Sequence, residues 1–236
     1  MRILVTRPAH DAQRTAEKLI AMGHEPVVAP VMTISPTDIP APAQSFDNII
    51  VTSANGAARL ADLPGWQDRT IYAVGPRTAD AILEYGAPHD LRIAAGDAVS
   101  IIAMVKAEQP RQISILHVTG VNHKAEPDRS LRAAGYEVFT WTAYEAAAAS
   151  SLPETARQAL QGKRLDAAIH YSRRSVETLV SLVTAAGMLE AFSTLRHFCL
   201  SDDIAEPLKA LNIKTIAASS DPSEAALLAL LPQHQA

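Results

Sequence analysis

Short apolar runs alternate with amphipathic segments along the whole chain. The first run, residues 2–6, is followed by a segment with apolar residues at helical spacing, which ends at Gly23. The predicted apolar face of that helix consists of Ala12, Ala16, Leu19 and Ile20. Strands that alternate with helices predict parallel sheets covered by helices. The predicted strands are residues 2–6, 26–34, 48–53, 70–75, 113–120, 136–145, 167–172, 197–201 and 213–219, with a weaker one at 90–94.

One strand–turn–helix pattern occurs twice. When the stretch 46–60 is shifted so that Ser53 falls on Ser172, Ile50 also falls on Ile169. Two other pairs of segments repeat in the same chain order, namely residues 3–31 with 115–143 and residues 70–83 with 196–208. The repeat predicts two α/β domains of the same kind.

Two domain divisions are compatible with this repeat. A simple one cuts the chain near residue 110. The other follows two long extended runs, which enter the Pro-rich segment "SPTDIPAPAQ" and a segment of small residues. We prefer the second, in which the two long strands pair as a two-stranded linker. It assigns residues 1–35 and 148–236 to one domain and 39–143 to the other, with linkers at 36–38 and 144–147.

Composition limits the classes of function. The 236 residues are 48% hydrophobic and 19% charged, as in ordinary globular proteins. The formal charge of -4 argues against general nucleic-acid binding, although local donors can still bind a small anion. The single cysteine, Cys199, lies in an apolar run typical of a buried strand. No signal peptide or membrane span is evident, so we expect a cytoplasmic monomer without membrane or nucleic-acid partners.

Candidate chemistry lies in the turns that follow the strands, because ligands of open parallel sheets bind at the carboxyl ends. Backbone N–H groups at helix N-termini in these turns favour anions. Arginine and lysine side chains add positive charge at Arg7, Arg77, Lys124, Arg173 and Arg174. The turns are residues 6–10, 52–56, 74–79, 118–126, 171–177 and 200–206. Six such turns from two domains would line a wide cleft, suited to a large ligand with several anionic groups.

Each of these features also has a purely structural interpretation. Three serines precede predicted helices and are typical N-cap residues, namely Ser53, Ser172 and Ser201. The Arg173–Arg174 pair is also typical of a solvated surface, and Asp202 with Asp203 is typical of a helix N-terminus. Tyr144, at the end of a long strand, could donate a proton into the cleft or pack the hinge.

Several common sites are absent from the sequence. No GxGxxG follows the first strand, which disfavours a dinucleotide cofactor and hence a dehydrogenase or methyltransferase of similar layering. There is no P-loop and no GxSxG elbow. The eight histidines lack metal-ligand spacing, and His117 and His170 lie within predicted strands, where packing roles are expected. No metal is therefore expected.

The ordered motifs "ILVTRP", "IIVTSANG", "AVGPRTA", "AGYEVFTWTAYE" and "YSRRSVE" resemble the uroporphyrinogen-III synthases over nearly the whole chain. The resemblance implies two flavodoxin-like α/β domains joined by a two-stranded linker. It also implies an enzyme that closes hydroxymethylbilane, a linear tetrapyrrole with eight carboxylates, to uroporphyrinogen III in haem biosynthesis. The last ring is inverted and water is lost, without cofactor or metal.

The turns and the resemblance together give a set of site residues. Tyr144 is the catalytic candidate, since it falls on the tyrosine of the family's "VY" motif. The family's usual turns read "SRRS", "SDDIA" and "TGVNHKAE" here, which puts their ligand roles in doubt. A non-catalytic sensor that closes on an anionic ligand is the alternative, and it needs no proton donor. The substrate-binding candidates are Arg7, Ser53, Ala54, Asn55, Gly75, Thr78, Thr119, Gly120, Lys124, Ser172, Arg173 and Ser201.

Overall fold

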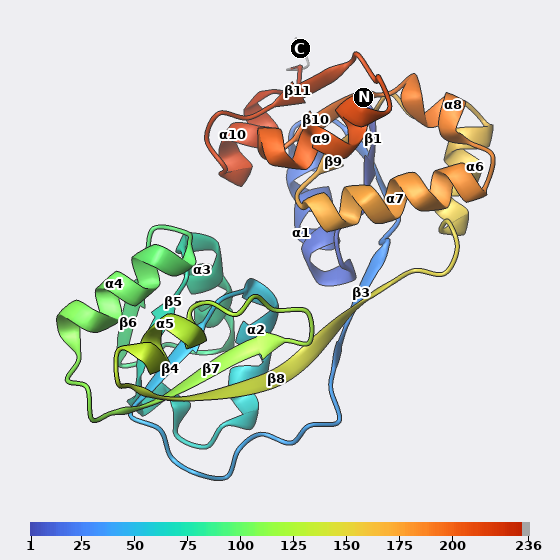
Figure 1. Cartoon of the computed structure of the whole chain (residues 1–236). Helices are drawn as coiled ribbons and strands as arrows, with labels where there is room; N and C mark the ends of the chain where they lie inside the picture. Colours follow the sequence, from blue (N-terminus) through green and yellow to red (C-terminus); the bar gives the residue numbers. More distant parts are fainter. Residues whose placement is uncertain (233–236) are drawn as a thin grey trace. The chain divides into compact units, whose positions relative to one another are not determined.

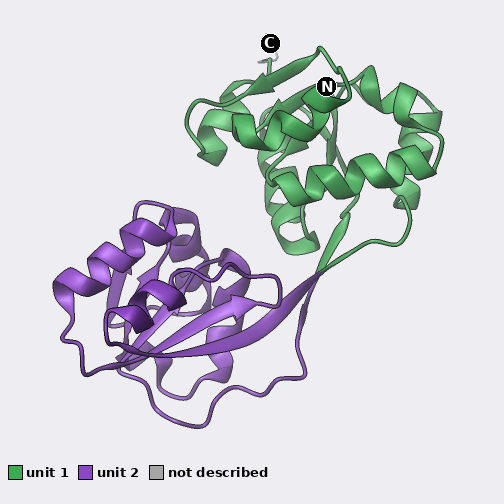
Figure 2. Cartoon of the chain, viewed as in Figure 1, with its two compact units in different colours: residues 1–33, 147–236 green, residues 34–146 purple. Residues whose placement is uncertain are grey.

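The chain folds into two compact α/β units. The computed structural model describes residues 1–232, and its contacts separate unit 1 (residues 1–33 and 147–236) from unit 2 (residues 34–146) (Figure 2). Each unit contains one sheet in which every assigned pair of core strands is parallel, with helices on its faces (Figure 1). The predicted α/β class with two similar parallel-sheet domains is confirmed.

Unit 1 is built on a five-stranded sheet in the order β11–β10–β9–β1–β2. The first strand of the chain therefore lies inside the sheet, next to a strand that comes more than half the chain later. The strands are β1 (Arg2–Val5), β2 (Glu25–Val28), β9 (Ala167–His170), β10 (Arg196–Cys199) and β11 (Ile216–Ala218). The helices are α1 (Ala9–Ala21), α6 (Glu154–Gln161), α7 (Arg173–Ala185), α8 (Leu189–Ser193), α9 (Asp202–Ala210) and α10 (Glu224–Ala229).

Helices α1 and α10 cover one face of the unit 1 sheet. Their apolar residues pack on alternate residues of β1 and β9, in one cluster that includes Ile3, Val5 and Ile169. The buried positions of α1 are Ala12, Thr15, Ala16 and Leu19, a complete stripe at helical spacing. Ile20 was predicted on this face, but it lies one step past the stripe and is 60% exposed.

Unit 2 is built on a six-stranded sheet in the order β3–β8–β7–β4–β5–β6. Its strands are β3 (Met32–Pro36), β4 (Asn48–Val51), β5 (Thr70–Ala73), β6 (Asp90–Ile93), β7 (Ser114–Gly120) and β8 (Glu137–Ala148). Its helices are α2 (Ala54–Ala57), α3 (Pro76–Tyr85), α4 (Ala98–Glu108) and α5 (Asp128–Ala133), with short 3-10 turns at Ala58–Asp62 and Trp66–Asp68.

Both faces of the unit 2 sheet are buried, which explains the continuous apolar runs of its strands. Side chains of a strand alternate between faces, so Ile49 and Val51 join one core cluster while Ile50 joins another. The first cluster includes residues of α2 and α3, and the second includes residues of α4 and α5. His117 of β7 pairs in register with Ile50 and shares the second face.

The two sheets have equivalent strand orders. In unit 1, β2 and β1 are followed across the sheet by β9, β10 and β11, and in unit 2 β8 and β7 are followed by β4, β5 and β6. Both are the flavodoxin-like order 2-1-3-4-5. The order reverses between β1 and β9 in unit 1 and between β7 and β4 in unit 2. These two reversal points are where ligands of such sheets bind.

Strands β3 and β8 pass from one unit to the other and lie next to each other. The predicted single run at 26–34 is two strands, since residues 29–31 separate β2 from β3 and bond instead to the end of β1. Beyond β3, the Thr37 hydroxyl donates to the Thr142 carbonyl (2.6 Å). Strand β8 continues to Ala148, so Tyr144 lies within the strand rather than at its end.

A buried histidine pair lies in the unit 1 sheet. His170 Nε2 and His197 Nδ1 are 3.0 Å apart, and the rings stack with centroids 5.3 Å apart. His197 Nε2 lies 3.2 Å from the Phe192 carbonyl, to which it can only donate. Its Nδ1 therefore accepts from His170, and both rings are neutral. Burial lowers the pKa of His170, and it lowers the pKa of His197 to about 4.

This pair predicts acid sensitivity of the fold. A histidine whose pKa falls on folding binds protons more readily when the chain is unfolded, so stability is lost as pH falls below the unfolded value of 6.5. We expect His197 alone to lower the free energy of unfolding by about 2 kcal/mol between about pH 7.5 and about pH 5. Urea unfolding at several pH values measures this. His89→Gln, which removes an exposed histidine, should keep the slope, and a flat profile in the parent chain would contradict the assignment.

Candidate functional site

Tyr144 and Ser53 meet at the carboxyl edge of the unit 2 sheet. Ser53 caps α2, its side-chain oxygen accepting from the Asn55 N–H (3.2 Å). A hydrogen bond also joins Ser53 to the Tyr144 phenol. Burial raises the pKa of Tyr144 and the bond from Ser53 lowers it, with a net increase. The phenol therefore keeps its proton at neutral pH.

Gly120 makes room for the tyrosine ring. The β7–β8 pairing is irregular at this point, where Thr119 pairs with Thr142 but Gly120 pairs with Tyr144. A Cβ added at Gly120 would lie 2.7 Å from Cε2 and 2.9 Å from Cζ of Tyr144. The Val121 N–H donates to the Tyr144 carbonyl (2.9 Å) and holds the two segments together. Gly120 thus serves the site by its missing side chain.

A second group of polar side chains lies at the strand-order reversal between β4 and β7. His117 is 1% and Asp128 4% exposed, and His117 Nδ1 lies 2.6 Å from Asp128 Oδ1. On the other side of the ring, Nε2 lies 2.8 Å from the hydroxyl of Thr52. The Thr140 hydroxyl donates to the second oxygen of Asp128. These contacts form a continuous chain from a buried carboxylate to a half-buried hydroxyl.

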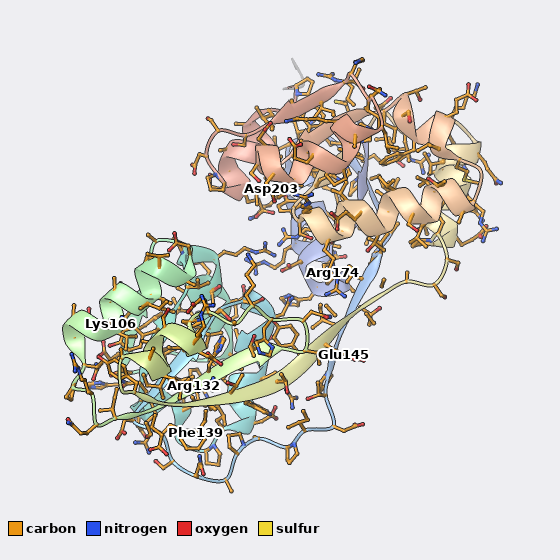
Figure 3. The ribbon with its side chains drawn as sticks, viewed as in Figure 1. Lys106, Arg132, Phe139, Glu145, Arg174 and Asp203 are labelled. Atoms are coloured by element: carbon orange, nitrogen blue, oxygen red, sulfur yellow. The ribbon has the colours of Figure 1, made fainter. Side chains whose placement is uncertain are left out.

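Asp128 is ionised despite its burial. Burial by itself raises the pKa of this carboxyl, but the bond and charge of His117 and the Thr140 hydroxyl outweigh it, and the pKa is lowered. Arg132, labelled on α5 in Figure 3, lies 3.6 Å from Asp128 and donates to Thr140 (2.8 Å). The carboxylate also borders an open hollow of about 570 Å³ lined by His123, Ala125, Arg129, Arg132, Thr140 and Thr142.

The other unit 2 candidates lie in neighbouring turns. Gly75 precedes α3, and a Cβ there would approach Gly96 Cα to 3.1 Å. Thr78 is buried, its N–H bonded to the Gly75 carbonyl (3.0 Å), and Thr119 is buried as well. Lys124 is exposed between β7 and α5. Of these four candidates, Lys124 is therefore the only one that is exposed to solvent.

The unit 1 turns place their serines at helix starts. Ser172 caps α7, accepting from the Ser175 N–H (3.2 Å), whereas Ser201 precedes α9 without a side-chain capping bond. Arg173 is exposed and bonds to Glu177 (3.0 Å) and Asp203 (2.9 Å). An exposed pair of this kind contributes little to stability.

Arg7 is engaged inside unit 1. It lies at the strand-order reversal between β1 and β9, where its guanidinium contacts Asp11 (2.8 Å) and Glu224 (2.9 Å) and lies 4.0 Å from the Tyr171 ring centroid. Burial raises the pKa of Glu224, but bonds from Lys18 and Tyr171 and the charge of Arg7 lower it to about 2. The predicted role of Arg7 as a substrate ligand therefore has an internal competitor, a carboxylate from α10.

Sequence reasoning passed over the Thr52–His117–Asp128 group. The sequence predicts a packing role for His117 within a strand and no role for Asp128. The sequence feature that indicates this group is a histidine in an otherwise apolar strand, followed by an acidic residue at the start of the next helix. Cys199 is buried as predicted, and burial raises its pKa to about 12. Within residues 1–232, no cluster of His, Cys, Asp and Glu could hold a metal, and no helix is long and apolar enough to cross a membrane.

Comparisons with known proteins agree with this architecture. The family profile described as uroporphyrinogen-III synthase HemD matches residues 13–229. The solved uroporphyrinogen-III synthetase of Helicobacter pylori is 16% identical, with a TM-score of 0.63 and 98% of each chain covered. A mutant synthase of the extremely thermophilic bacterium Thermus thermophilus is 19% identical, with a TM-score of 0.55 over 97% of this chain and 96% of that one. No curated protein sequence matches.

The Gly120–Tyr144 packing predicts a specific cost of a methyl group. Gly120→Ala should destabilise the protein by about 1–3 kcal/mol, because either the ring or the strand must move. Gly162→Ala is the control, since the only contact below 3.0 Å is to the exposed side chain of Arg164, which can swing away, and the next atom, the Gln158 carbonyl oxygen, is 3.2 Å away. Equilibrium unfolding measures the loss of unfolding free energy in both variants. Equal losses would contradict the packing of Tyr144 against Gly120.

Proposed function

The chain belongs to the uroporphyrinogen-III synthase family, and on that premise we propose which of its residues close hydroxymethylbilane to uroporphyrinogen III. The reaction removes the terminal hydroxyl of the linear tetrapyrrole, inverts its last ring and closes the macrocycle with net loss of water. The family assignment selects this enzyme over the sensor considered from the sequence. The observation that carries the residue assignment is the Tyr144–Ser53–Gly120 cluster at the carboxyl edge of unit 2.

Tyr144 assists departure of the hydroxyl. Its phenol is protonated at neutral pH, and in the proposed mechanism Ser53 donates to the phenol oxygen and leaves the phenolic proton for the substrate. A departing hydroxyl that receives this proton leaves as water. Ser53 then stabilises the phenolate until solvent restores the proton. This is general acid catalysis by a positioned side chain, which typically contributes about 10²-fold or more.

Backbone N–H groups at helix starts bind the substrate carboxylates. In unit 2 the groups belong to Ala54, next to Asn55, whose own N–H bonds to Ser53, and to the turn after Gly75, and in unit 1 to the helix starts that follow Ser172 and Ser201. Such termini favour anions through unpaired donors and the helix dipole. Lys124 and Arg173 supply mobile positive charge at the surface. Binding of the carboxylates at several points folds the linear tetrapyrrole into its reactive shape. This orientation lowers the free-energy barrier of the reaction.

The product of the reaction and the effect of a change at Tyr144 test the proposed function. The purified protein, given hydroxymethylbilane, should form isomer III, whereas spontaneous closure yields isomer I. Tyr144→Phe should lower the rate about 10²-fold with folding intact, because the proton donor is lost. Resolution of the isomers by chromatography and far-UV circular dichroism measure both effects. Tyr85→Phe, at an exposed site, is the control. Unchanged turnover would remove Tyr144 from catalysis, and isomer I alone would refute the synthase.

The second prediction concerns unit 1. Ser172→Ala should raise KM several-fold, because the N-terminal turn of α7 loses a polar group next to the bound carboxylate. The change also removes a cap, which costs about 1 kcal/mol of stability. Ser223→Ala removes an equivalent cap on α10, where Ser223 accepts from the Ala226 N–H (3.2 Å), and serves as the control. Steady-state kinetics should separate the two variants, and equal KM values would show that Ser172 is only a cap.

A further inference from the structure

We propose that Thr52, His117 and Asp128 form a proton relay that accepts the ring-carbon proton released when the macrocycle closes. This inference rests on the proposed synthase function. It assigns a second proton-transfer group to the reaction, distinct from the Tyr144 donor. It also gives a role to three side chains that neither the family resemblance nor the turn chemistry singled out.

The contacts determine the direction of the relay. An ionised carboxylate can only accept, so the imidazole Nδ1, 2.6 Å from Asp128 Oδ1, carries a hydrogen. The relay starts from the neutral form of His117, in which the Nε2 atom is a bare acceptor. The Thr52 hydroxyl, 2.8 Å away, therefore donates its hydrogen to Nε2. Asp128 determines the tautomer, and the Thr52 hydroxyl, which can donate or accept, adapts to it.

This direction makes Thr52 differ from the neighbouring groups. Its only hydrogen is directed inward to His117, so the outer side of its oxygen presents lone pairs and cannot donate to a substrate carboxylate. The N–H groups of α2, by contrast, are donors. His117 and Asp128 are buried, whereas Thr52 is half-buried, so Thr52 is the end of the chain that a substrate can reach. At the carboxyl edge of the unit 2 sheet, the Thr52 oxygen is thus a hydrogen-bond acceptor next to N–H groups that act as donors.

The location supports a ligand role. Thr52 directly follows β4 and His117 lies on β7, the two strands between which the order of the sheet reverses. Ligands of open parallel sheets bind at this point. Thr52 also directly precedes Ser53, which bonds to Tyr144. The proton acceptor, Thr52, and the hydrogen-bond partner of the proton donor Tyr144, Ser53, are therefore adjacent residues of one turn.

The proton balance of the reaction requires an acceptor. Loss of water means that one hydroxide leaves the terminal carbon and that one hydrogen leaves the ring carbon of the inverted ring at which the last carbon–carbon bond forms. As the new carbon–carbon bond is completed, Thr52 takes the ring-carbon proton and passes its own hydrogen to His117 Nε2. The electron pair of the broken carbon–hydrogen bond restores the aromatic pyrrole. The imidazolium is stabilised by Asp128 and later releases its proton to solvent.

The charges around His117 are compatible with this cycle. Asp128 is the one ionised group in direct contact among the residues described, and it favours the imidazolium. Arg132 lies 3.6 Å from Asp128, and the ring of His123, the other titratable group nearby, has its centroid 6.5 Å from that of His117. Thr140 and Arg132 hold Asp128 from the opposite side. The carboxylate is thus fixed in place before the proton arrives.

The first test uses a substrate that carries deuterium on the ring carbon. Thr52→Val should lower kcat by about 10²-fold and produce a kinetic isotope effect larger than in the parent enzyme, because proton removal becomes rate-limiting. Thr52→Ser retains the hydroxyl and should restore most of the rate. A slow Thr52→Val enzyme with an unchanged isotope effect would overturn the relay, since that result indicates only altered packing.

The second test asks whether His117 acts through Thr52. His117→Gln and Thr52→Val should not be additive, so the double variant should be about as slow as the slower single variant. His89→Gln, at an exposed site, is the matched control and should retain full activity. Additive losses would overturn the relay.

The third test does not depend on activity. In ¹⁵N-histidine spectra of the parent chain, His117 should show a protonated Nδ1 and an unprotonated Nε2, and Asp128→Asn should alter that pattern. The opposite tautomer would overturn the proposal. A parent enzyme that forms only isomer I would refute the synthase itself, whereas one that forms isomer III while Thr52→Val is unimpaired would refute the relay alone.

Discussion

The parallel pairing of β1 with β9 is the contact on which the arrangement of the chain depends. Ile3, Leu4 and Val5 pair with Ala167, Ala168 and Ile169, and all six are completely buried. Because a strand in the middle of a sheet needs a partner on both sides, β1 brings the start of the chain to its second half. The intervening residues must then leave and return, which they do along β3 and β8. Unit 2 is consequently an insertion with its own complete sheet.

In unit 2 the strands occupy the sheet in a different chain order. Its strands β8, β7, β4, β5 and β6 take the same places in the sheet as β2, β1, β9, β10 and β11 of unit 1, but β7 and β8 come after β4, β5 and β6 in the chain. The last strand, β8, therefore both completes the sheet and leads out of the unit. Tyr144 lies on this strand and packs against Gly120, where the pairing with β7 is irregular. The irregularity and the missing Cβ together bring the phenol to Ser53.

The two units use equivalent positions for different chemistry. In unit 1 the strand-order reversal is occupied by Arg7, Tyr171 and Glu224, a set of internal partners that includes a carboxylate from α10. In unit 2 the corresponding position holds the Thr52–His117–Asp128 chain. A duplicated fold thus provides one site stabilised by internal ion pairing and another with a hydroxyl accessible at the end of a buried dyad. The two equivalent turns therefore differ in the side-chain contacts they make.

The sequence by itself determined the α/β class, nearly all the strands and the repeat, because these depend on local alternation of apolar and polar residues and on glycines that end helices. It also indicated the family through ordered motifs. Tertiary structure alone decided that Ile20 faces solvent, that Arg7 pairs with Glu224 and that Gly120 accommodates Tyr144. It alone brought His117 to Asp128 and Thr52. Each of these depends on contacts between side chains from separate elements, and the spacing of residues along the chain carries no record of which hydrogen-bonding groups meet in space.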